Sequence, residues 1–327
     1  MNKAIIYTHI FIIIFLSEAI FNNLFSQNNQ FDSYSEKILG TKQSIKMIPI
    51  AGGIFTMGSS KNEKKRKRDE GPITNVFVDG FWISEIEVTW DVYELFLNRS
   101  ADKEHVKKAE LNLNIDAISG ATAPYVNYNK KGYPVVNVTQ YAASQFCKWL
   151  SAKTGNFYRL PTEAEWEFAC RAGNDEPYSF GKNARKMNEY GWFKKNSNGQ
   201  IQKVRLKKPN AFGIYDMHGN VAEWVLDSYN PETYILWGNS VKNPVMIGKK
   251  LYPRVVRGGS FKSNIDELRS AARGFSKEKW KRRDPQIPKS LWWFTDANNI
   301  GFRIVRPKKT PNKDDINKMW VNPIKEY

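Results

Sequence analysis

From Tyr178 onward the chain contains no long run of helical or strand periodicity. Short apolar pieces are separated there by Gly, Asn, Pro and aromatic residues, a pattern typical of loops that pack through their own side chains. Before this point, two segments have apolar residues at helical spacing, 139–150 and 162–169. The sequence therefore predicts helices in its first half and large aromatic-rich loops in its second.

Composition agrees with a globular protein, because 41% of the 327 residues are hydrophobic and 14% are aromatic. The formal net charge is +17, yet the 50 Lys and Arg residues are scattered. Only the run 64–68 is dense, and Asp69 and Glu70 follow it directly. No nucleic-acid-binding motif accompanies this run, so a solvated loop is the better interpretation and no nucleic-acid partner is expected.

The N-terminal region has the features of a secretory signal. Lys3 precedes the apolar run 4–16, which is short for a membrane span but suits a signal peptide. We expect residues 1–27 to be a signal peptide, cleaved after Ala19 or nearer Gln27, an uncleaved anchor being the alternative. The mature protein would then be exported, to the periplasm, the envelope or the medium, with no transmembrane domain.

Composition divides the rest of the chain into three parts. Residues 28–46 are polar and predict a linker, and residues 47–307 are expected to form the domain. Residues 308–327 predict a polar C-terminal tail, which Trp320 could anchor to the domain. The segment 100–133 predicts an irregular insertion.

Local signals place several elements within the domain. Residues 48–58 predict a strand interrupted by a Gly-Gly bend, and Asp79-Gly80 predicts a hairpin within 76–88. Strands are also expected at 254–256 and 302–305. Thr89 and Thr139 are expected to begin helices, while Thr162 and Glu165 form the capping box of another helix.

The chain has two cysteines, Cys147 and Cys170. In an exported protein they could pair, but each lies in a segment with helical periodicity, which favours two buried thiols. Of three histidines, at 9, 105 and 218, the first lies in the signal, so a His-rich metal site is not expected. His218 is interpreted as a hydrogen-bonded structural residue.

Six motifs, four of them in close order, resemble the formylglycine-generating enzymes, also called sulfatase-modifying factors. They are GGIFTMGS (52–59), EVTWDVYELFLN (87–98), RLPTEAEWEFACRAG (159–173), NAFGIYDMHGNVAEWV (210–225), VVRGGSF (255–261) and GFRIVRP (301–307). The resemblance implies an α+β fold, a single loop-rich domain related to C-type lectins, with little regular secondary structure and a surface groove.

A structural calcium site is expected in the fourth motif. Asp216 and Glu223 supply carboxylate oxygens, while backbone carbonyls at Gly219 and Val221 could turn toward the same point. The resemblance implies calcium at these four positions. The alternative is structural: Glu223 caps a loop and Asp216 pairs with a lysine.

The resemblance also implies a second, weaker calcium site near Asn188 and Glu189, whose remaining ligands cannot be assigned.

The family's active site, as the resemblance implies, holds copper(I) between two cysteines and uses O₂ to convert a substrate cysteine to formylglycine. Ser263 occupies the first position, and the second has no counterpart. The resemblance also implies that Cys147 and Cys170 match cysteines outside that site, which form disulfides in secreted relatives. The positions of their disulfide partners are occupied here by Ile304 and Ser270. Because copper(I) prefers sulfur to a protonated hydroxyl, copper is not expected.

Four residues, Ser260, Ser263, Arg273 and Trp224, are expected to line a polar groove, although packing of the loops explains each equally well. The leading hypothesis is an exported, calcium-stabilised, non-catalytic domain that acts as a binding or assembly module of the bacterial envelope, as in gliding or secretion components. One alternative is an oxidoreductase that converts a protein cysteine to formylglycine. Another is lectin-like glycan binding through tryptophans such as Trp292 and Trp293, which are more readily explained as core.

Overall fold

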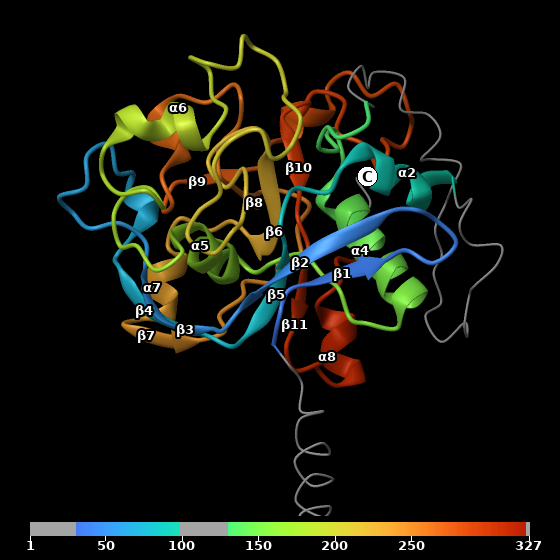
Figure 1. Ribbon diagram of the computed structural model, residues 1–327, viewed down its shortest axis with the longest axis horizontal. Coiled ribbons are helices and arrows are strands. Elements are labelled where there is room, and N and C mark those ends of the chain that lie inside the picture. The colour runs from blue at the N-terminus through green and yellow to red at the C-terminus, as the bar shows by residue number, and fades with distance from the viewer. Residues whose placement is uncertain (1–30, 99–129, 325–327) are drawn as a thin grey trace, which may run out of the picture. The chain divides into compact units, whose positions relative to one another are not determined.

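The computed structural model describes residues 31–98 and 130–324 (Figure 1). They form an α+β domain of three small sheets, three longer helices and extensive loops. The first sheet joins the two ends of the domain, because two of its strands come from residues near 40 and one from residues near 306. In spatial order they are β1 (Tyr34–Lys37), β2 (Ser44–Ile50), β5 (Phe81–Ser84) and β11 (Val305–Pro307).

The second sheet contains the strand after the Gly-Gly bend. It consists of β3 (Gly53–Met57), β4 (Thr74–Val78) and β7 (Ser240–Lys242). The third sheet lies under the groove described below. Its strands, in spatial order, are β10 (Ile300–Phe302), β6 (Ala222–Ser228), β8 (Arg254–Arg257) and β9 (Arg273–Phe275), so β9 is an edge strand.

The helices begin where local signals place them. Thr139 accepts a hydrogen bond from Ala142 N–H at the start of α4 (Gln140–Thr154), and Thr162 and Glu165 form the expected capping box of α5 (Glu163–Arg171). The third longer helix is α2 (Trp90–Asn98). The shorter elements are η1 (Arg68–Glu70), η2 (Ala184–Lys186), α6 (Met187–Tyr190), α7 (Thr233–Trp237), η3 (Ile265–Leu268), η4 (Glu278–Lys281) and α8 (Lys313–Lys318).

Two large hydrophobic cores and a smaller cluster around Met187 hold these elements. One surrounds α2 and α4, where Tyr93, Phe96 and Phe146 pack as an aromatic cluster. The other surrounds α5 and contains Trp166 and Val225. Trp292 and Trp293 are buried in the first core, as expected of tryptophans with a packing role.

The predicted hairpin at Asp79-Gly80 is wrong. β4 and β5 flank this dipeptide, but β4 pairs with β3 and β7, whereas β5 pairs with β2 and β11. The dipeptide therefore carries the chain from one sheet to another. The expected strand at 302–305 is similarly the junction between β10 and β11, which belong to different sheets.

The linker interpretation of residues 28–46 is wrong from Tyr34 onward, because β1 pairs with β2 in a regular antiparallel register. In the C-terminal tail, Trp320 is buried and its indole N–H donates to the Tyr158 carbonyl at 3.0 Å. The predicted signal peptide and most of the predicted insertion lie outside the described residues. Within the described ranges, no helix is long and apolar enough to cross a membrane.

Candidate functional site

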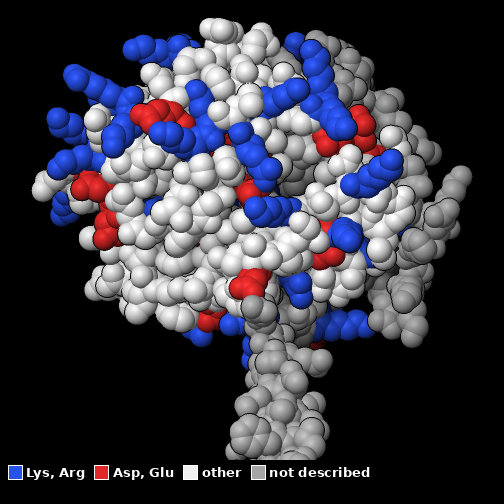
Figure 2. Space-filling view, in the orientation of Figure 1, with Lys and Arg blue, Asp and Glu red and all other residues white. Residues whose placement is uncertain are grey.

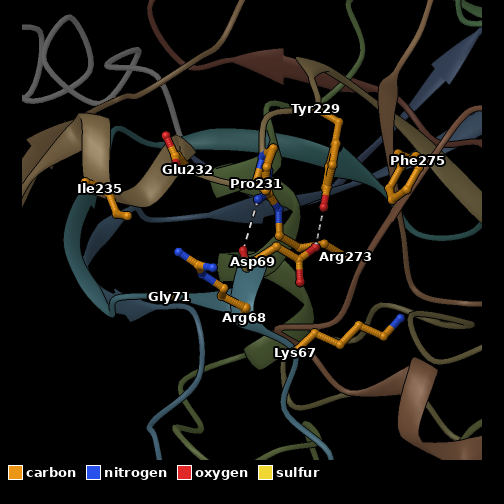
Figure 3. A pocket seen from close by; sticks show the side chains of 10 residues that line it. All are labelled: Lys67, Arg68, Asp69, Gly71, Tyr229, Pro231, Glu232, Ile235, Arg273 and Phe275. Carbon is orange, nitrogen blue, oxygen red and sulfur yellow. Dashed lines mark hydrogen bonds between the residues drawn. The ribbon is translucent and has the colours of Figure 1, made fainter.

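Two adjoining hollows flank the edge strand β9. The first, of about 300 Å³, contains Ser260 and Ser263 in its lining. The second, of about 410 Å³, lies beside η1 and α7 (Figure 3). Both are lined by Lys67, Arg273 and Phe275, so they adjoin, and we call the two together the β9 groove.

The two predicted groove serines brace the loop that follows β8. Ser260 N–H donates to Ser263 Oγ at 3.1 Å, and Ser263 N–H donates back to the Ser260 carbonyl at 2.9 Å. Ser260 Oγ accepts from the Asn299 amide at 3.0 Å. Ser260 is fully buried, whereas Ser263 is half-buried and borders the groove. Both hydroxyls therefore hold the groove wall in shape.

Arg273 forms the base of the groove and uses its donors within the protein. It binds both oxygens of Glu163, at 2.7 and 2.9 Å, and donates to the carbonyls of Asp69 and Asn230. The guanidinium also lies over the ring of Tyr229 at 4.9 Å. Its role is to clamp η1 and α7 against β9, rather than to offer a free charge.

Trp224, the fourth predicted groove residue, lies in the core instead. Its side chain is fully buried, its indole N–H donates to the Val138 carbonyl at 2.9 Å, and its ring packs against Trp280 and Phe294. Trp224 lines a separate, small hollow of about 20 Å³. Of the four residues, Ser260, Ser263 and Arg273 line the β9 groove and Trp224 does not.

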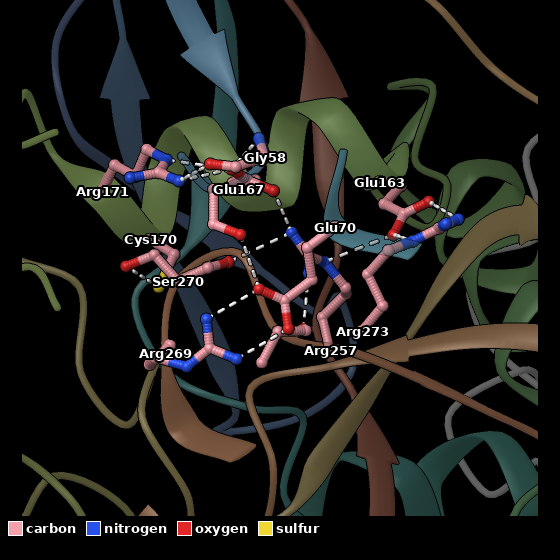
Figure 4. A network of polar contacts seen from close by, with 12 residues as sticks. Gly58, Glu70, Glu163, Glu167, Cys170, Arg171, Arg257, Arg269, Ser270 and Arg273 are labelled. Atoms are coloured by element: carbon pink, nitrogen blue, oxygen red, sulfur yellow. Dashed lines mark hydrogen bonds and ion pairs between the residues drawn. The ribbon is translucent and has the colours of Figure 1, made fainter. Parts of the chain in front are cut away.

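Behind the groove lies a buried ion network centred on α5 (Figure 4). Glu163 and Glu167 stand one helical turn apart and bind Arg273 and Arg257, which come from β9 and β8. Its remaining members are Arg171, which binds Glu167, and Arg269, which binds Glu70 and Glu63. Four arginines thus match four glutamates, and the network fixes the strand that lines the groove.

The two cysteines are free, buried and unable to supply thiolates. Burial raises the pKa of Cys147 far above its usual value and that of Cys170 to about 12. Cys170 lies 3.6 Å from Ser270 Oγ, at the position where the resemblance implies a cysteine partner. The expectation of two buried thiols is confirmed.

His218 has the structural role expected of it. Its Nδ1–H donates to the Leu268 carbonyl at 2.7 Å, and its Nε2 accepts from Ser179 N–H at 3.1 Å. Burial lowers its pKa to about 4, so the ring is neutral near pH 7.

The predicted calcium residues lie in a second buried charge cluster, which we call the Asp216 cluster: Asp216, Glu87, Glu223 and Arg303. Arg303 binds both oxygens of Glu223 at 2.6 Å, so Glu223 is mainly its ion-pair partner. Asp216 accepts one hydrogen bond, from Arg205 N–H, and its other oxygen has no partner. One oxygen of Glu87 is likewise buried without a partner.

This surplus of carboxylate oxygen is the feature of the cluster that fits a cation. Burial, with the nearby carboxylates adding to it, raises the pKa of Glu87, and burial raises that of Asp216 to about 6. Asp216 and Glu87 therefore fit calcium better than Glu223 does. In the described part of the chain, no three His, Cys, Asp or Glu side chains are grouped closely enough to hold a metal, so ligation would need backbone oxygens such as those of Gly219 and Val221.

The second, weaker calcium position does not fit a metal. The Asn188 carbonyl accepts from Lys207 Nζ at 2.6 Å, and that ammonium also lies 3.7 Å from the centre of the Trp192 ring. Glu189 forms an ion pair with Lys208 at 2.6 Å. Lysine ammonium groups therefore stand where the resemblance implies a divalent cation.

Sequence reasoning missed three features of this site. The Glu163, Glu167 and Arg171 spacing on one helical face was a visible signal for the ion network. Lys67 belongs to the basic run, but nothing local places it beside β9. Glu87 lies in a quoted motif and carried no sign of its burial beside Asp216.

Comparison with known proteins shows which family and fold the chain resembles. The family model for the sulfatase-modifying factor enzyme 1-like domain, FGE-sulfatase, matches residues 36–308. The formylglycine-generating enzyme of Mus musculus is 27% identical over 301 residues, covering 79% of this chain and 74% of that protein. The structure of PvdO from Pseudomonas aeruginosa has a TM-score of 0.64 and 25% identity, covering 86% of this chain and 99% of that one.

A further relative is named serine/threonine-protein kinase pkn1, from Chlamydia pneumoniae, and is 32% identical over 259 residues. The match covers 78% of this chain but only 38% of the kinase's length. The shared part is therefore a domain of a longer protein in that relative. Taken with the fold and the motifs, the family match shows that this chain belongs to the sulfatase-modifying factor, or formylglycine-generating enzyme, family.

Proposed function

We propose that the chain is an exported, non-catalytic member of this family that binds a partner in the bacterial envelope through the β9 groove. The observation that carries the proposal is the pair of serines at the groove wall. Ser263 stands where the resemblance implies the first copper-binding cysteine and its hydroxyl accepts from Ser260 N–H, while both cysteines are buried in the two cores. The scaffold keeps its groove without soft ligands for copper(I).

The structural part of the proposal concerns calcium. We propose that the ion, when bound, balances the carboxylates of Asp216 and Glu87, with Glu223 held ready by Arg303. Its contribution would be to stiffen the loop between Asp216 and β6, whose backbone makes few regular hydrogen bonds. No step at the groove depends on it.

Glycan binding has weaker support. The tryptophans that suggested it, Trp292 and Trp293, are about 4% and 3% exposed and pack in the core, so they offer no stacking surface. A kinase activity is not proposed, because this chain covers a minor part of the relative that carries that name.

Binding is tested by crosslinking the purified protein in the envelope fraction of its source and comparing two variants. Ser263→Trp places a large ring at the groove wall, while Ser35→Trp places the same ring on an exposed position of β1. We expect Ser263→Trp to abolish capture of the partner and Ser35→Trp to leave it unchanged. Equal capture by both variants would remove the groove from the function.

A further inference from the structure

We propose that the β9 groove takes an extended acidic segment of a protein partner, which adds as a strand to the free edge of β9. The inference rests on the proposed binding function and specifies its ligand. It commits to a peptide backbone paired with β9 and to Asp or Glu side chains facing the lysines of the rim.

The backbone of β9 offers the edge. Among the strands of residues 31–98 and 130–324, β9 pairs with β8 alone, with Gly274 opposite Val256, and Ser276 N–H donates to the Arg254 carbonyl. Because bonded and non-bonded pairs alternate in an antiparallel ladder, Gly274 bonds to β8, and the N–H and C=O groups of Arg273 and Phe275 point the other way. Both residues line the two hollows, so these groups face the groove rather than a neighbouring strand.

Unpaired cations surround this edge. Lys67, Arg68, Lys277 and Lys279 line the groove, and all four are exposed. Among the described residues, none of the four forms an ion pair with a carboxylate, in contrast to the fully matched arginines behind them. Figure 2 shows Lys and Arg outnumbering Asp and Glu over one face of the molecule, in line with a net charge of +17. An acidic ligand would therefore be attracted by the positive electrostatic potential of the groove.

The walls favour a peptide over a polyphosphate or an anionic glycan. Phe275 stacks on Tyr229 with ring centres 4.3 Å apart, and Ile235, about 56% exposed, lines the opposite side of the second hollow, so part of that hollow is apolar (Figure 3). Glu232 and Glu267 also line the groove and would repel a polymer charged at every unit. Successive side chains of a strand point to opposite sides. An extended segment with alternating acidic and apolar residues therefore suits both the basic rim and the apolar wall.

The test measures binding of fluorescein-labelled peptides of roughly eight residues, long enough to span a strand of ordinary length. The probe alternates Glu and Val, and the control alternates Lys and Val. The decisive variants share one position: Phe275→Pro removes both the ring and the outward N–H, whereas Phe275→Ala removes the ring alone. Proline is tolerated there because this N–H bonds to no strand.

We expect the Glu-Val peptide to bind and the Lys-Val peptide not to. Phe275→Pro should bind about tenfold more weakly than Phe275→Ala, as expected for losing a main-chain hydrogen bond in the complex. Lys67→Glu with Lys277→Glu should weaken binding by about tenfold and remove most of its salt dependence. The exposed pair Lys37→Glu with Lys313→Glu, which changes net charge equally, should have an effect of less than about twofold.

Equal binding of the peptide by the two Phe275 variants would overturn strand addition. Equal binding of the Glu-Val and Lys-Val peptides would overturn the acidic preference. Competition by sodium polyphosphate that matches the peptide would instead identify a polymer ligand, against the inference. If the peptide fails while Ser263→Trp still abolishes partner capture, only this inference falls. If Ser263→Trp leaves capture unchanged as well, the proposed function falls with it.

Discussion

The two buried charge clusters of this domain are built from the same residue types but balanced differently. Behind the groove, the α5 network matches four glutamates with four arginines, and Glu163, Glu167 and Glu70 are completely buried. In the Asp216 cluster, three buried carboxylates share one buried guanidinium, Arg303, and two of their oxygens have no partner.

The two clusters therefore differ in whether their charges are balanced within the protein. In the α5 network each carboxylate gains a guanidinium, so it holds β8, β9 and η1 together as ion pairs without a further ligand. In the Asp216 cluster the surplus charge needs a proton or a cation, and the raised pKa values of Asp216 and Glu87 express that need. The strands that line the groove should therefore keep their positions with or without metal. The stability of the loop that contains Asp216 should instead depend on pH and calcium.

Removing one arginine from the α5 network should have the largest effect. Arg257→Leu leaves Glu167 and Glu163 buried with less compensation, so we expect the free energy of unfolding in urea to fall by about 3–5 kcal/mol. Arg283→Leu, which breaks an exposed pair with Asp296, should cost less than about 1 kcal/mol. Adding Glu167→Gln to Arg257→Leu should recover part of the loss; no recovery would mean that packing, not charge balance, stabilises the network.

Removing one carboxylate from the Asp216 cluster should have the opposite sign. Burial raises the pKa of Asp216 from 3.8 to about 6, so the unfolded chain loses this proton first and stability falls as pH rises from about 4 to 6. Asp216→Asn keeps an acceptor for Arg205 N–H. In the presence of a chelator we expect the variant to be more stable by about 3 kcal/mol at pH 7 and unchanged near pH 3.5.

Outside the Asp216 cluster, Asp227 and His218 also titrate in this range, and the comparison with wild type cancels their contributions. Burial raises the pKa of Asp227 to about 7, which also lowers stability as pH rises. Burial lowers the pKa of His218 to about 4, so its effect is opposite: stability is lost as pH falls from 6.5 to 4. An Asp216→Asn variant less stable than wild type at pH 7 would show that the cluster carries no surplus charge.

Calcium should act on the second cluster alone. At about 100 times its dissociation constant the ion should add about 2.7 kcal/mol, raising the melting temperature at pH 7 by roughly 5 °C. Asp216→Asn should lose most of this shift, and magnesium at equal concentration should not reproduce it. An identical calcium shift in wild type and Asp216→Asn would place the ion elsewhere.

The smallest effect is expected where lysine stands at the second calcium position. Lys207→Met removes a hydrogen bond to the Asn188 carbonyl and a cation–π contact with Trp192, costing about 1 kcal/mol. The exposed Lys249→Met serves as the matched control. Calcium should not restore Lys207→Met, and a restored melting temperature would show that the ion competes with this ammonium.

The sequence predicted what local chemistry determines. The caps at Thr139 and Thr162 were recognisable because each satisfies N–H groups within three residues, and the apolar spacing of α4 and α5 follows from one helical period. The family and its α+β fold followed from ordered motifs that span the domain. Ser260, Ser263 and Arg273 belong to or follow one of these motifs, and all three line the β9 groove.

What the sequence missed depends on contacts between distant residues. β5 and β11 pair across more than two hundred residues, so Asp79-Gly80 looked like a hairpin although its strands enter different sheets. Trp224 sits on β6 among residues that are nearly all buried, so its sequence neighbours could not show which face it occupies. The pairing of Glu223 with Arg303 likewise joins β6 to the segment between β10 and β11, and local pattern does not reveal it.

The proposed function requires that this member of the family binds a partner without oxidising it. Its most direct test is incubation of the protein with a Cys-x-Pro-x-Arg peptide, copper and O₂, followed by mass analysis of the peptide. We predict an intact thiol, because Ser263 stands in the first copper position and both cysteines are buried with raised pKa values. Loss of the thiol with formation of the aldehyde would contradict the claim.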